Sequence, residues 1–232
     1  DVAGAMTSAL RKLGFDRVFD TGFTADLTIM EEASELAHRI RTGGPLPMMT
    51  SCSPGWIKFI EQFYPDLLPN VSTCKSPQQM MGAIIKSYFA EREGIDPARI
   101  FSVSIMPCTA KKFEASRPEM GDGHHQDIDA VLTTRELARI IKMRGLDLNT
   151  LLPDIADTPF GERSSAGKLF GTSGGVMEAA IRTAHFLLSG REMPNLKVEA
   201  VRGMDSVKEA RVTIGDIEVG RASCRERVYH PV

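Results

Sequence analysis

Hydrophobic and polar positions along the chain follow two periods, and these predict helices interleaved with short strands. Apolar residues spaced three and four positions apart predict amphipathic helices, over residues 2–13, 24–42, 54–63, 77–92, 134–144 and 171–188. Short apolar or β-branched runs between prolines and glycines predict strands, at residues 17–20, 47–50, 100–106, 127–132, 196–202, 210–214 and 217–220. Residues 112–126 are polar and contain glycine, which predicts a loop, and we expect residues 145–168 to form an irregular connection.

Strands that alternate with helices predict an α/β fold with mainly parallel sheets flanked by helices. The length of 232 residues suits one full-sized domain or two small lobes that share a core. Because sites in parallel sheets gather at the carboxyl ends of strands, the turns at Cys52, Cys108 and Gly171 are the expected site. The Gly171 turn resembles an anion-binding helix N-terminus, although Ser173 could simply cap the helix there.

Composition and charge narrow the class of protein. Hydrophobic residues make up 42% of the chain and charged residues 25%, which excludes a wholly disordered chain. The formal net charge of −2 gives no electrostatic basis for nucleic-acid binding. No run reaches the roughly 18 to 20 apolar residues that span a bilayer. We expect a cytoplasmic protein, because the first residues do not resemble a signal peptide, and the absent starting Met predicts a chain that begins within a longer protein.

Cysteines are the first candidates for chemistry. The four cysteines, Cys52, Cys74, Cys108 and Cys224, are too few and too scattered for a disulfide scaffold, so reduced thiols are expected. Cys52 and Cys108 each follow a predicted strand beside a proline turn, where a thiolate can bind zinc or an iron–sulfur cluster. Neither belongs to a Cys-x-x-Cys pair, so the alternative of a small core residue stays open for both.

Charged residues add two further candidates. Lys111 follows Cys108 by three residues, so its ammonium could lower the pKa of that thiol or hold an anion beside it. A solvated lysine is the alternative. Glu32, Glu35 and Arg39 lie on one side of the 24–42 helix, where carboxylates that reach inward could pass protons. An exposed stripe of ion pairs is the alternative for these three residues.

Several of these stretches together resemble the [FeFe]-hydrogenase family. Residues 50–56, Thr-Ser-Cys-Ser-Pro-Gly-Trp, resemble its first cysteine signature. Residues 106–114, Met-Pro-Cys-Thr-Ala-Lys-Lys-Phe-Glu, resemble its second. Residues 76–79, 127–131, 133–137 and 170–179 also match the family pattern. The resemblance runs from residue 1 to about residue 220, and the two cysteine signatures in the right order make it highly specific.

The resemblance implies the fold and the chemistry of an H-cluster domain. Such a domain has a two-lobed α/β fold, and it reduces protons to H2 or oxidises H2. Its H-cluster joins a [4Fe-4S] cubane, through a cysteine, to a two-iron centre that carries CO, cyanide and a bridging azadithiolate. The resemblance implies electrons from ferredoxin or from NAD(P)H-linked electron-transfer subunits, and hydrogenase maturation proteins as assembly partners.

The resemblance also implies roles for individual residues. Cys108 matches a ligand of the cubane, and Lys111 matches the lysine that donates a hydrogen bond to a cyanide of the two-iron centre. Pro77 and Gln78 match residues that contact the cyanides. Met106, Phe170 and Gly171 match residues that pack around the two-iron centre. Glu32, Glu35 and Ser72 match residues of the family's proton path, and Arg39 matches the residue at the outer end of that path. The resemblance therefore favours proton transfer over an exposed stripe for these carboxylates.

The first departure from the family concerns Cys52. The family has two adjacent cysteines in its first signature, of which the first relays protons and the second, before proline, ligates the cubane. Ser53 occupies the second position here. Strict alignment makes Cys52 the proton relay, whereas the weakness of serine as an iron ligand favours Cys52 as a metal ligand, with Ser53 in the relay. Both roles, catalytic and metal-binding, stay open for Cys52.

The second departure is the absence of the third cysteine signature, which supplies two cubane ligands, after residue 220. We therefore assign residues 1–220 to a partial H-cluster domain and residues 221–232 to an atypical tail, for which a non-native origin is favoured and a frayed native end is the alternative; the resemblance implies no role for Cys224. Because a cubane needs four ligands, we expect this fragment not to retain the cofactor and to be inactive alone. A cluster-binding assembly factor or an H2 sensor is the alternative function, and a nucleotide-binding α/β module is the alternative on fold alone.

Overall fold

The structure, a computed structural model, describes the chain except residues 1, 173, 194–198, 202–203, 215–216 and 226–232. The chain divides into two compact units. Unit 1 comprises residues 1–24, 52–59 and 75–162, and unit 2 comprises residues 25–51, 60–74 and 163–232. Each unit is therefore assembled from segments that lie far apart in the sequence.

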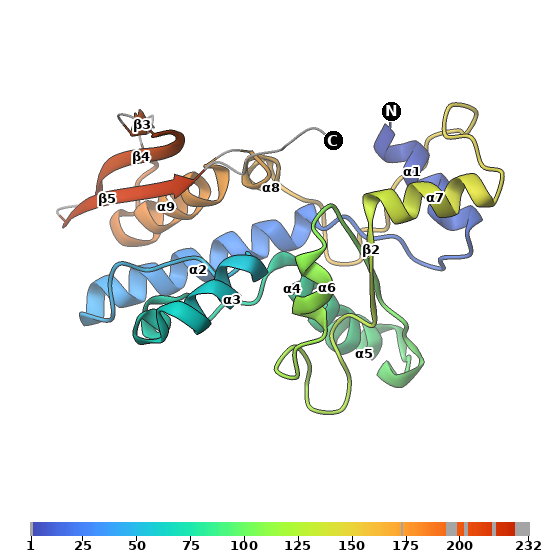
Figure 1. The fold of residues 1–232 in the computed structure, drawn as a ribbon, viewed down its shortest axis with the longest axis horizontal. Coiled ribbons are helices and arrows are strands. Elements are labelled where there is room, and N and C mark those ends of the chain that lie inside the picture. The colour runs from blue at the N-terminus through green and yellow to red at the C-terminus, as the bar shows by residue number, and fades with distance from the viewer. Residues whose placement is uncertain (1, 173, 194–198, 202–203, 215–216, 226–232) are drawn as a thin grey trace. The chain divides into compact units, whose positions relative to one another are not determined.

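Helices make up most of the described elements (Figure 1). The α-helices are α1 (Val2–Lys12), α2 (Gly22–Thr42), α3 (Pro54–Phe63), α4 (Pro77–Ile84), α5 (Ala90–Glu93), α6 (Ala110–Ala115), α7 (Thr134–Met143), α8 (Ser165–Phe170) and α9 (Gly175–Ser189). Short 3-10 or π segments are η1 (Pro65–Asn70), η2 (Ile85–Phe89) and η3 (Pro97–Arg99). The strands are β1 (Val103–Met106), β2 (Ala130–Thr133), β3 (Glu199–Val201), β4 (Met204–Ile214) and β5 (Ile217–Arg225).

In unit 1, α1 and α7 lie side by side (Figure 1) and share a small apolar core. Ala9 and Leu10 of α1 pack in this core with Leu137 and Ile141 of α7. Each pair lies on one face of its helix, as the apolar spacing predicts. Gly14 follows α1 with a φ of +99°, a left-handed conformation that glycine adopts without strain and that suits the end of a helix.

The two strands of unit 1 position the turn that contains Cys108. β1 and β2 pair in parallel, with Val103 opposite Ala130. Since β1 ends at Met106, Cys108 and then α6 follow at the carboxyl end of the strand. Helix α4 approaches the chain just before β2 at Gly82, where a Cβ atom would lie 2.3 Å from the carbonyl oxygen of Asp127. Only glycine permits this approach.

In unit 2, α2 packs against α9 through small and apolar side chains. Ala33 of α2 is fully buried with Met177, Ile181 and Ala184 of α9. Strands β3, β4 and β5 form an antiparallel sheet in that order, and Figure 1 shows α9 beside β4 and β5. Gly175, the first residue of α9, lies against the carbonyl group of Leu169 in α8. A Cβ atom at this position would overlap that carbonyl group.

Most predicted helices are confirmed, with shifts of a few residues at their ends. The helix predicted over 77–92 is one helical stretch that contains a π turn at η2. The helix predicted to begin at the 171–175 turn begins at Gly175 with Gly174 as its N-cap, and Ser173 lies outside the described residues. The strands at 100–106 and 127–132 are confirmed in shorter form as β1 and β2.

Several predictions of strands and loops are wrong. The sheet of unit 2 is antiparallel rather than parallel, because the connections between its strands are far too short for a parallel crossover. Residues 17–20 and 47–50 form the isolated parallel bridges Phe19–Asp157 and Met49–Val71 in place of full strands. The predicted loop at 112–126 begins within α6, and the predicted irregular connection at 145–168 contains the start of α8.

Candidate functional site

A buried polar cluster in unit 1 surrounds Lys111 on α6. The ammonium Nζ donates hydrogen bonds to Glu114 Oε2 at 2.9 Å and Oε1 at 3.1 Å, and to the backbone oxygen of Cys52 at 2.9 Å. The backbone N–H of Lys111 donates to the carbonyl of Cys108 at 3.2 Å. Although Lys111 is charged, it is only 8% exposed. The fold therefore connects this buried cation to the backbones of both cysteines that the sequence predicts as metal ligands.

Helix α4 contributes Gln78 to the same cluster. Gln78 is 2% exposed, and its Nε2 donates to Glu114 Oε2 at 3.1 Å and to the carbonyl of Lys111 at 3.3 Å. Ser104 Oγ of β1 donates to Gln78 Oε1 at 2.8 Å, and Ser76 Oγ donates to Glu114 Oε2 at 2.9 Å. Pro77 provides the first residue of α4. Thus Gln78 and Lys111, predicted from separate motifs, meet in one cluster, and Pro77 begins the helix that carries Gln78.

Cys52 and Cys108 are the metal-ligand candidates of unit 1. Cys52 is buried just before α3, whereas Cys108 is partly exposed between β1 and α6, and neither forms a disulfide. Across the described part of the chain, no three histidine, cysteine, aspartate or glutamate side chains gather closely enough to hold a metal ion. Because a [4Fe-4S] cubane takes four ligands, the donors present fit only part of such a site.

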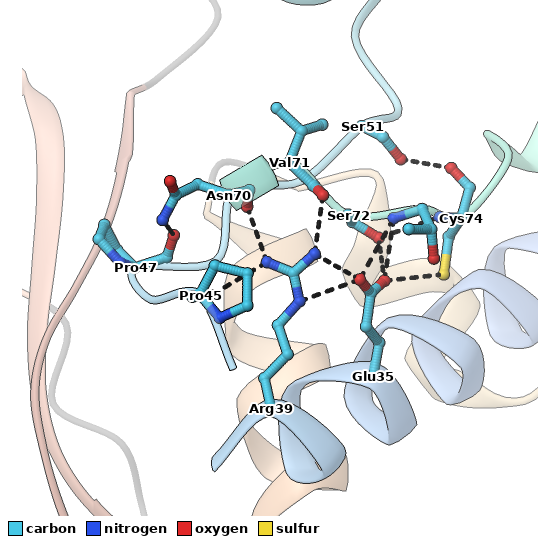
Figure 2. A network of polar contacts seen from close by, with 10 residues as sticks. Glu35, Arg39, Pro45, Pro47, Ser51, Asn70, Val71, Ser72 and Cys74 are labelled. Atoms are coloured by element: carbon cyan, nitrogen blue, oxygen red, sulfur yellow. Dashed lines mark hydrogen bonds and ion pairs between the residues drawn. The ribbon is translucent and has the colours of Figure 1, made fainter. Parts of the chain in front are cut away.

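Unit 2 contains a second polar cluster, centred on Glu35 of α2 (Figure 2). Glu35 Oε2 accepts a hydrogen bond from Ser72 Oγ at 2.8 Å and from the backbone N–H of Thr73 at 3.0 Å. Cys74 Sγ donates to the same oxygen at 3.7 Å. Arg39 donates to Oε1 from Nη2 at 2.6 Å and from Nε at 3.0 Å. Burial raises the pKa of Glu35, but these donors outweigh it, so the pKa is lowered overall and the carboxylate is ionised at neutral pH.

Arg39 fixes two loops beside Glu35 (Figure 2). Its Nη1 donates to the carbonyls of Pro45 and Asn70, both at 3.1 Å, and its Nη2 donates to the carbonyl of Val71 at 2.8 Å. Arg39 is only 6% exposed. Because the guanidinium carries five donors in a fixed plane, it can bind Glu35 and all three carbonyls together. The exposed ion-pair stripe, the alternative for this helix face, is therefore wrong for Arg39 and Glu35.

Glu32 lies one turn before Glu35 on α2 and is fully buried. Neither carboxyl oxygen forms a hydrogen bond of ordinary length and angle with the residues that the structure describes, although the backbone of Ser51 comes near enough to favour the charged form. Burial raises the pKa of Glu32 to about 7, the backbone of Ser51 opposes this rise, and the charge of Glu35 adds to it. Ser51 directly precedes Cys52 in the sequence. Glu32 can therefore hold or release a proton near neutral pH.

Cys74 is a member of this cluster that sequence reasoning missed. Burial raises the pKa of its thiol to about 11, so the thiol is protonated and can donate to Glu35. Its carbonyl accepts a hydrogen bond from Ser51 Oγ. Glu114 of unit 1 is the second missed residue. Its spacing of three from Lys111 would have indicated contact on a helix, but the sequence predicted a loop there.

The remaining predicted site residues lie outside the two polar clusters. Met106 ends β1 and packs against the apolar core of Ala115, Ile128 and Val131. Phe170 is the last residue of α8, and Gly171 caps its C-terminus. Met106 thus belongs to unit 1, whereas Phe170 and Gly171 belong to unit 2. Of the described helices, none has the length and apolar character needed to cross a bilayer.

Comparisons with known proteins give one consistent match. A family model described as iron only hydrogenase large subunit, C-terminal domain, matches residues 1–226. Iron hydrogenase 1 of Clostridium pasteurianum is 50% identical over 216 residues, which cover 93% of this chain and 38% of that protein. The NADP-reducing hydrogenase subunit HndD of Solidesulfovibrio fructosivorans is 50% identical over 224 residues, which cover 94% of this chain and 38% of that protein.

Solved structures and a second class of relatives complete the comparison. A cysteine-to-histidine variant of the apo [FeFe]-hydrogenase HydA1 from Chlamydomonas reinhardtii aligns with a TM-score of 0.81 and 52% identity. The alignment covers 91% of this chain and 53% of that one. Cytosolic iron-sulfur assembly component 3 of Pongo abelii is 35% identical, over 88% of this chain and 45% of that protein. The chain thus spans about half or less of the relatives that it matches.

Proposed function

The chain belongs to the iron-only hydrogenase family, and from this premise we propose that it forms part of an H-cluster domain that reduces protons to H2 or oxidises H2. That activity belongs to the whole enzyme, because the chain spans only part of its relatives. The observation that carries the proposal is the pair formed by Glu32 and Glu35. It places a carboxyl with a pKa of about 7 one turn from an ionised carboxylate, next to a chain segment that leads into Cys52.

Proton transfer is the chemistry that this pair supports. A group whose pKa lies near the working pH both accepts and releases protons readily. We propose that Glu35 Oε2 takes a proton supplied through Ser72 or the thiol of Cys74, and that the Glu32 carboxyl holds the next one. Arg39 keeps Glu35 ionised and oriented between transfers. These roles match those that the family resemblance implies for Glu32, Glu35, Ser72 and Arg39.

The cofactor itself fits this chain only in part. We propose Cys108 and Cys52 as thiolate ligands of the cubane. We propose Lys111 and Gln78 as hydrogen-bond donors to the anionic two-iron centre, through the N–H groups that the structure directs to the backbone carbonyls of Cys52 and Lys111. When bound, the H-cluster would supply the electrons and the metal chemistry that form H2. Because the described residues do not complete a four-ligand set, Cys52 and Cys108 would hold the cubane only weakly without further ligands. The chain alone is expected to produce no H2.

Electron-transfer partners follow from the same proposal. One matched relative is named as a subunit of an NADP-reducing hydrogenase, which supports an NAD(P)H-linked subunit as the electron source, and ferredoxin stays a prediction. Maturation proteins as assembly partners, and a cytoplasmic location, stay predictions. Assembly function is less well supported, because identity is 50% to the hydrogenases and 35% to the assembly protein. Glu32 and Glu35 argue against an H2 sensor of low turnover.

A chimeric enzyme tests the proposed function. Residues 1–220 would replace the matching segment of the Clostridium pasteurianum iron hydrogenase, and H2 production and iron content would be measured after maturation. We expect the chimera to produce H2, and Glu35→Gln to lower the rate by about tenfold or more, the range that general acid–base groups contribute. Glu31→Gln, on an exposed position of the same helix, is the matched control and should leave the rate unchanged. A chimera that binds the iron of the parent enzyme yet produces no H2 would overturn the proposal.

The same chimera separates the two roles of Cys52. If Cys52 is the proton relay, Cys52→Ala keeps the iron content and abolishes H2 production. If Cys52 is a cubane ligand, Cys52→Ala lowers the iron content, and Ser53→Ala then lowers the rate alone. Glu31→Gln, the exposed control above, should change neither the iron content nor the rate.

A further inference from the structure

Glu114 accepts hydrogen bonds from three buried side chains at the centre of the unit 1 cluster. Its carboxylate is 3% exposed and is bound by Lys111 Nζ, Gln78 Nε2 and Ser76 Oγ. We propose that Glu114 is a positioning residue that holds the ammonium of Lys111 and the amide of Gln78 in fixed orientations next to Cys52. A role of Glu114 in binding the two-iron centre rests on the proposed function. The orientations that Glu114 gives to Lys111 and Gln78 do not depend on that function.

The Lys111 ammonium makes as many hydrogen bonds in this cluster as it has N–H donors. An ammonium has three N–H donors, and Lys111 directs them to the two oxygens of Glu114 and to the carbonyl of Cys52. A carboxylate has about four acceptor sites, and Glu114 uses Oε1 for Lys111 and Oε2 for Lys111, Gln78 and Ser76. Replacing either oxygen by an NH2 group would set a donor against a donor.

Glu114 also determines which end of the Gln78 amide faces which neighbour. The NH2 end points to Glu114 Oε2, and the carbonyl end accepts from Ser104 Oγ at 2.8 Å. An amide rotated by half a turn would place its oxygen against the carboxylate and its NH2 against a hydroxyl. The negative charge of Glu114 therefore fixes the amide in one orientation, which leaves little freedom to a side chain that is 2% exposed.

Charge makes the contact with Lys111 more than a packing contact. Removing one partner of a buried ion pair leaves the other charge uncompensated in a medium of low dielectric. Without Glu114, Lys111 would keep the Cys52 carbonyl as its one acceptor among the contacts above. We expect the ammonium then to leave the cluster and become accessible to solvent. That exposure makes the amine more reactive toward an acylating reagent.

The test is chemical acetylation of the chain by acetic anhydride, with the rate at each lysine followed by mass spectrometry. In Glu114→Gln, acetylation of Lys111 is expected to become about tenfold faster or more, because a buried pair is broken. Lys86 is the matched internal control, because its side chain is 8% exposed, compared with 10% for Lys111, and is paired with Asp129 in the same unit. A positioning role predicts a selective change at Lys111.

A merely structural role predicts a different result. If Glu114 only supports the packing of unit 1, Lys111 and Lys86 would become reactive together, and that result would overturn the proposal. Glu136→Gln is the second control, because Glu136 pairs with the exposed Lys112. It should raise acetylation of Lys112 and leave Lys111 unchanged. The Gln78 side-chain NH2 signals provide a further readout in NMR spectra, since their slow hydrogen exchange is expected to be lost in Glu114→Gln and retained in Glu136→Gln.

Glu114→Asp keeps the experiment decisive if Glu114→Gln does not fold. Aspartate retains the negative charge, but its side chain is shorter by one methylene, so the carboxylate would lie farther from Lys111. Lys111 should therefore show a smaller but still selective increase in acetylation. No selective increase in a folded Glu114→Asp variant would overturn the proposal. Because acetylation uses the chain without any cofactor, a failed chimera would disprove the hydrogenase function and leave this result standing, and the reverse also holds.

Discussion

Glu32 and Glu35 lie one turn apart on α2, and their pKa values depart from the ordinary value in opposite directions. Burial raises that of Glu32 to about 7, whereas Ser72, Arg39 and a backbone N–H together lower that of Glu35 despite its burial. The difference arises because Arg39 and Ser72 donate to one carboxylate only. Two identical side chains thereby divide into a proton holder and a carboxylate that is ionised between proton transfers, an arrangement that acid–base sites use.

The raised pKa of Glu32 predicts a pH dependence of stability that Glu32→Gln should remove. Between about pH 4.5 and 7 the folded state holds a proton that the unfolded state has released, so stability falls as the pH rises through this window. The loss amounts to at most about 3 kcal/mol and is complete above pH 7. Denaturant unfolding at several pH values measures it. Glu31→Gln, an exposed neighbour, should follow the wild-type curve, and parallel curves for all three proteins would contradict the assignment.

Arg39→Lys is expected to destabilise unit 2 by about 2–4 kcal/mol, although it keeps the positive charge. Lysine has three donors and cannot reach Glu35 together with the carbonyls of Pro45, Asn70 and Val71. Urea unfolding measures the loss. Arg41→Lys is the control, because Arg41 is exposed and donates to the carbonyl of Leu187, so we expect a change within about 0.5 kcal/mol. Equal losses in the two variants would show that Arg39 does not clamp the loops.

Cys74 should react slowly with iodoacetamide, because its pKa of about 11 leaves little thiolate at pH 8. Two neighbours should change this rate in opposite directions. Glu35→Gln removes a negative charge that raises the pKa and should speed alkylation, whereas Ser72→Ala removes a hydrogen bond that lowers the pKa and should slow it. Mass spectrometry of the alkylated chain gives both rates. Acceleration in both variants would indicate loosened packing instead of an electrostatic effect.

Gly82→Ala should destabilise unit 1 by about 1–3 kcal/mol, the usual effect of overpacking. A Cβ atom at Gly82 would lie 2.3 Å from the carbonyl oxygen of Asp127 and 2.8 Å from Ile128, so α4 would have to move away. Gly55→Ala is the matched control, because Gly55 also lies in a helix and has open space where its Cβ would be. It should be neutral or stabilising. Thermal unfolding of both variants distinguishes the close approach from the helix propensity of alanine.

The sequence alone was sufficient for the elements that depend on local pattern. Apolar spacing predicted α1, α2, α3 and α7, and proline and glycine positions explained where several of them begin or end. The two cysteine signatures were sufficient to indicate the family, and the match of residues 1–226 to the family model agrees with them. Such features are readable because helix periodicity and short motifs are properties of neighbouring residues.

Strand direction and the division of roles among charged residues required the tertiary structure. The sequence predicted mainly parallel sheets, yet β4 and β5 are antiparallel, because an alternating pattern does not encode its partner. It placed Glu32 and Glu35 on one helix face but could not show that only Glu35 meets Arg39 and Ser72. The sequence also could not show that Glu114 of the second cysteine signature accepts hydrogen bonds from Ser76 and Gln78, which lie far away in the sequence at the start of α4. Burial, pairing and pKa depend on which distant groups surround a side chain, and only the packed fold determines that.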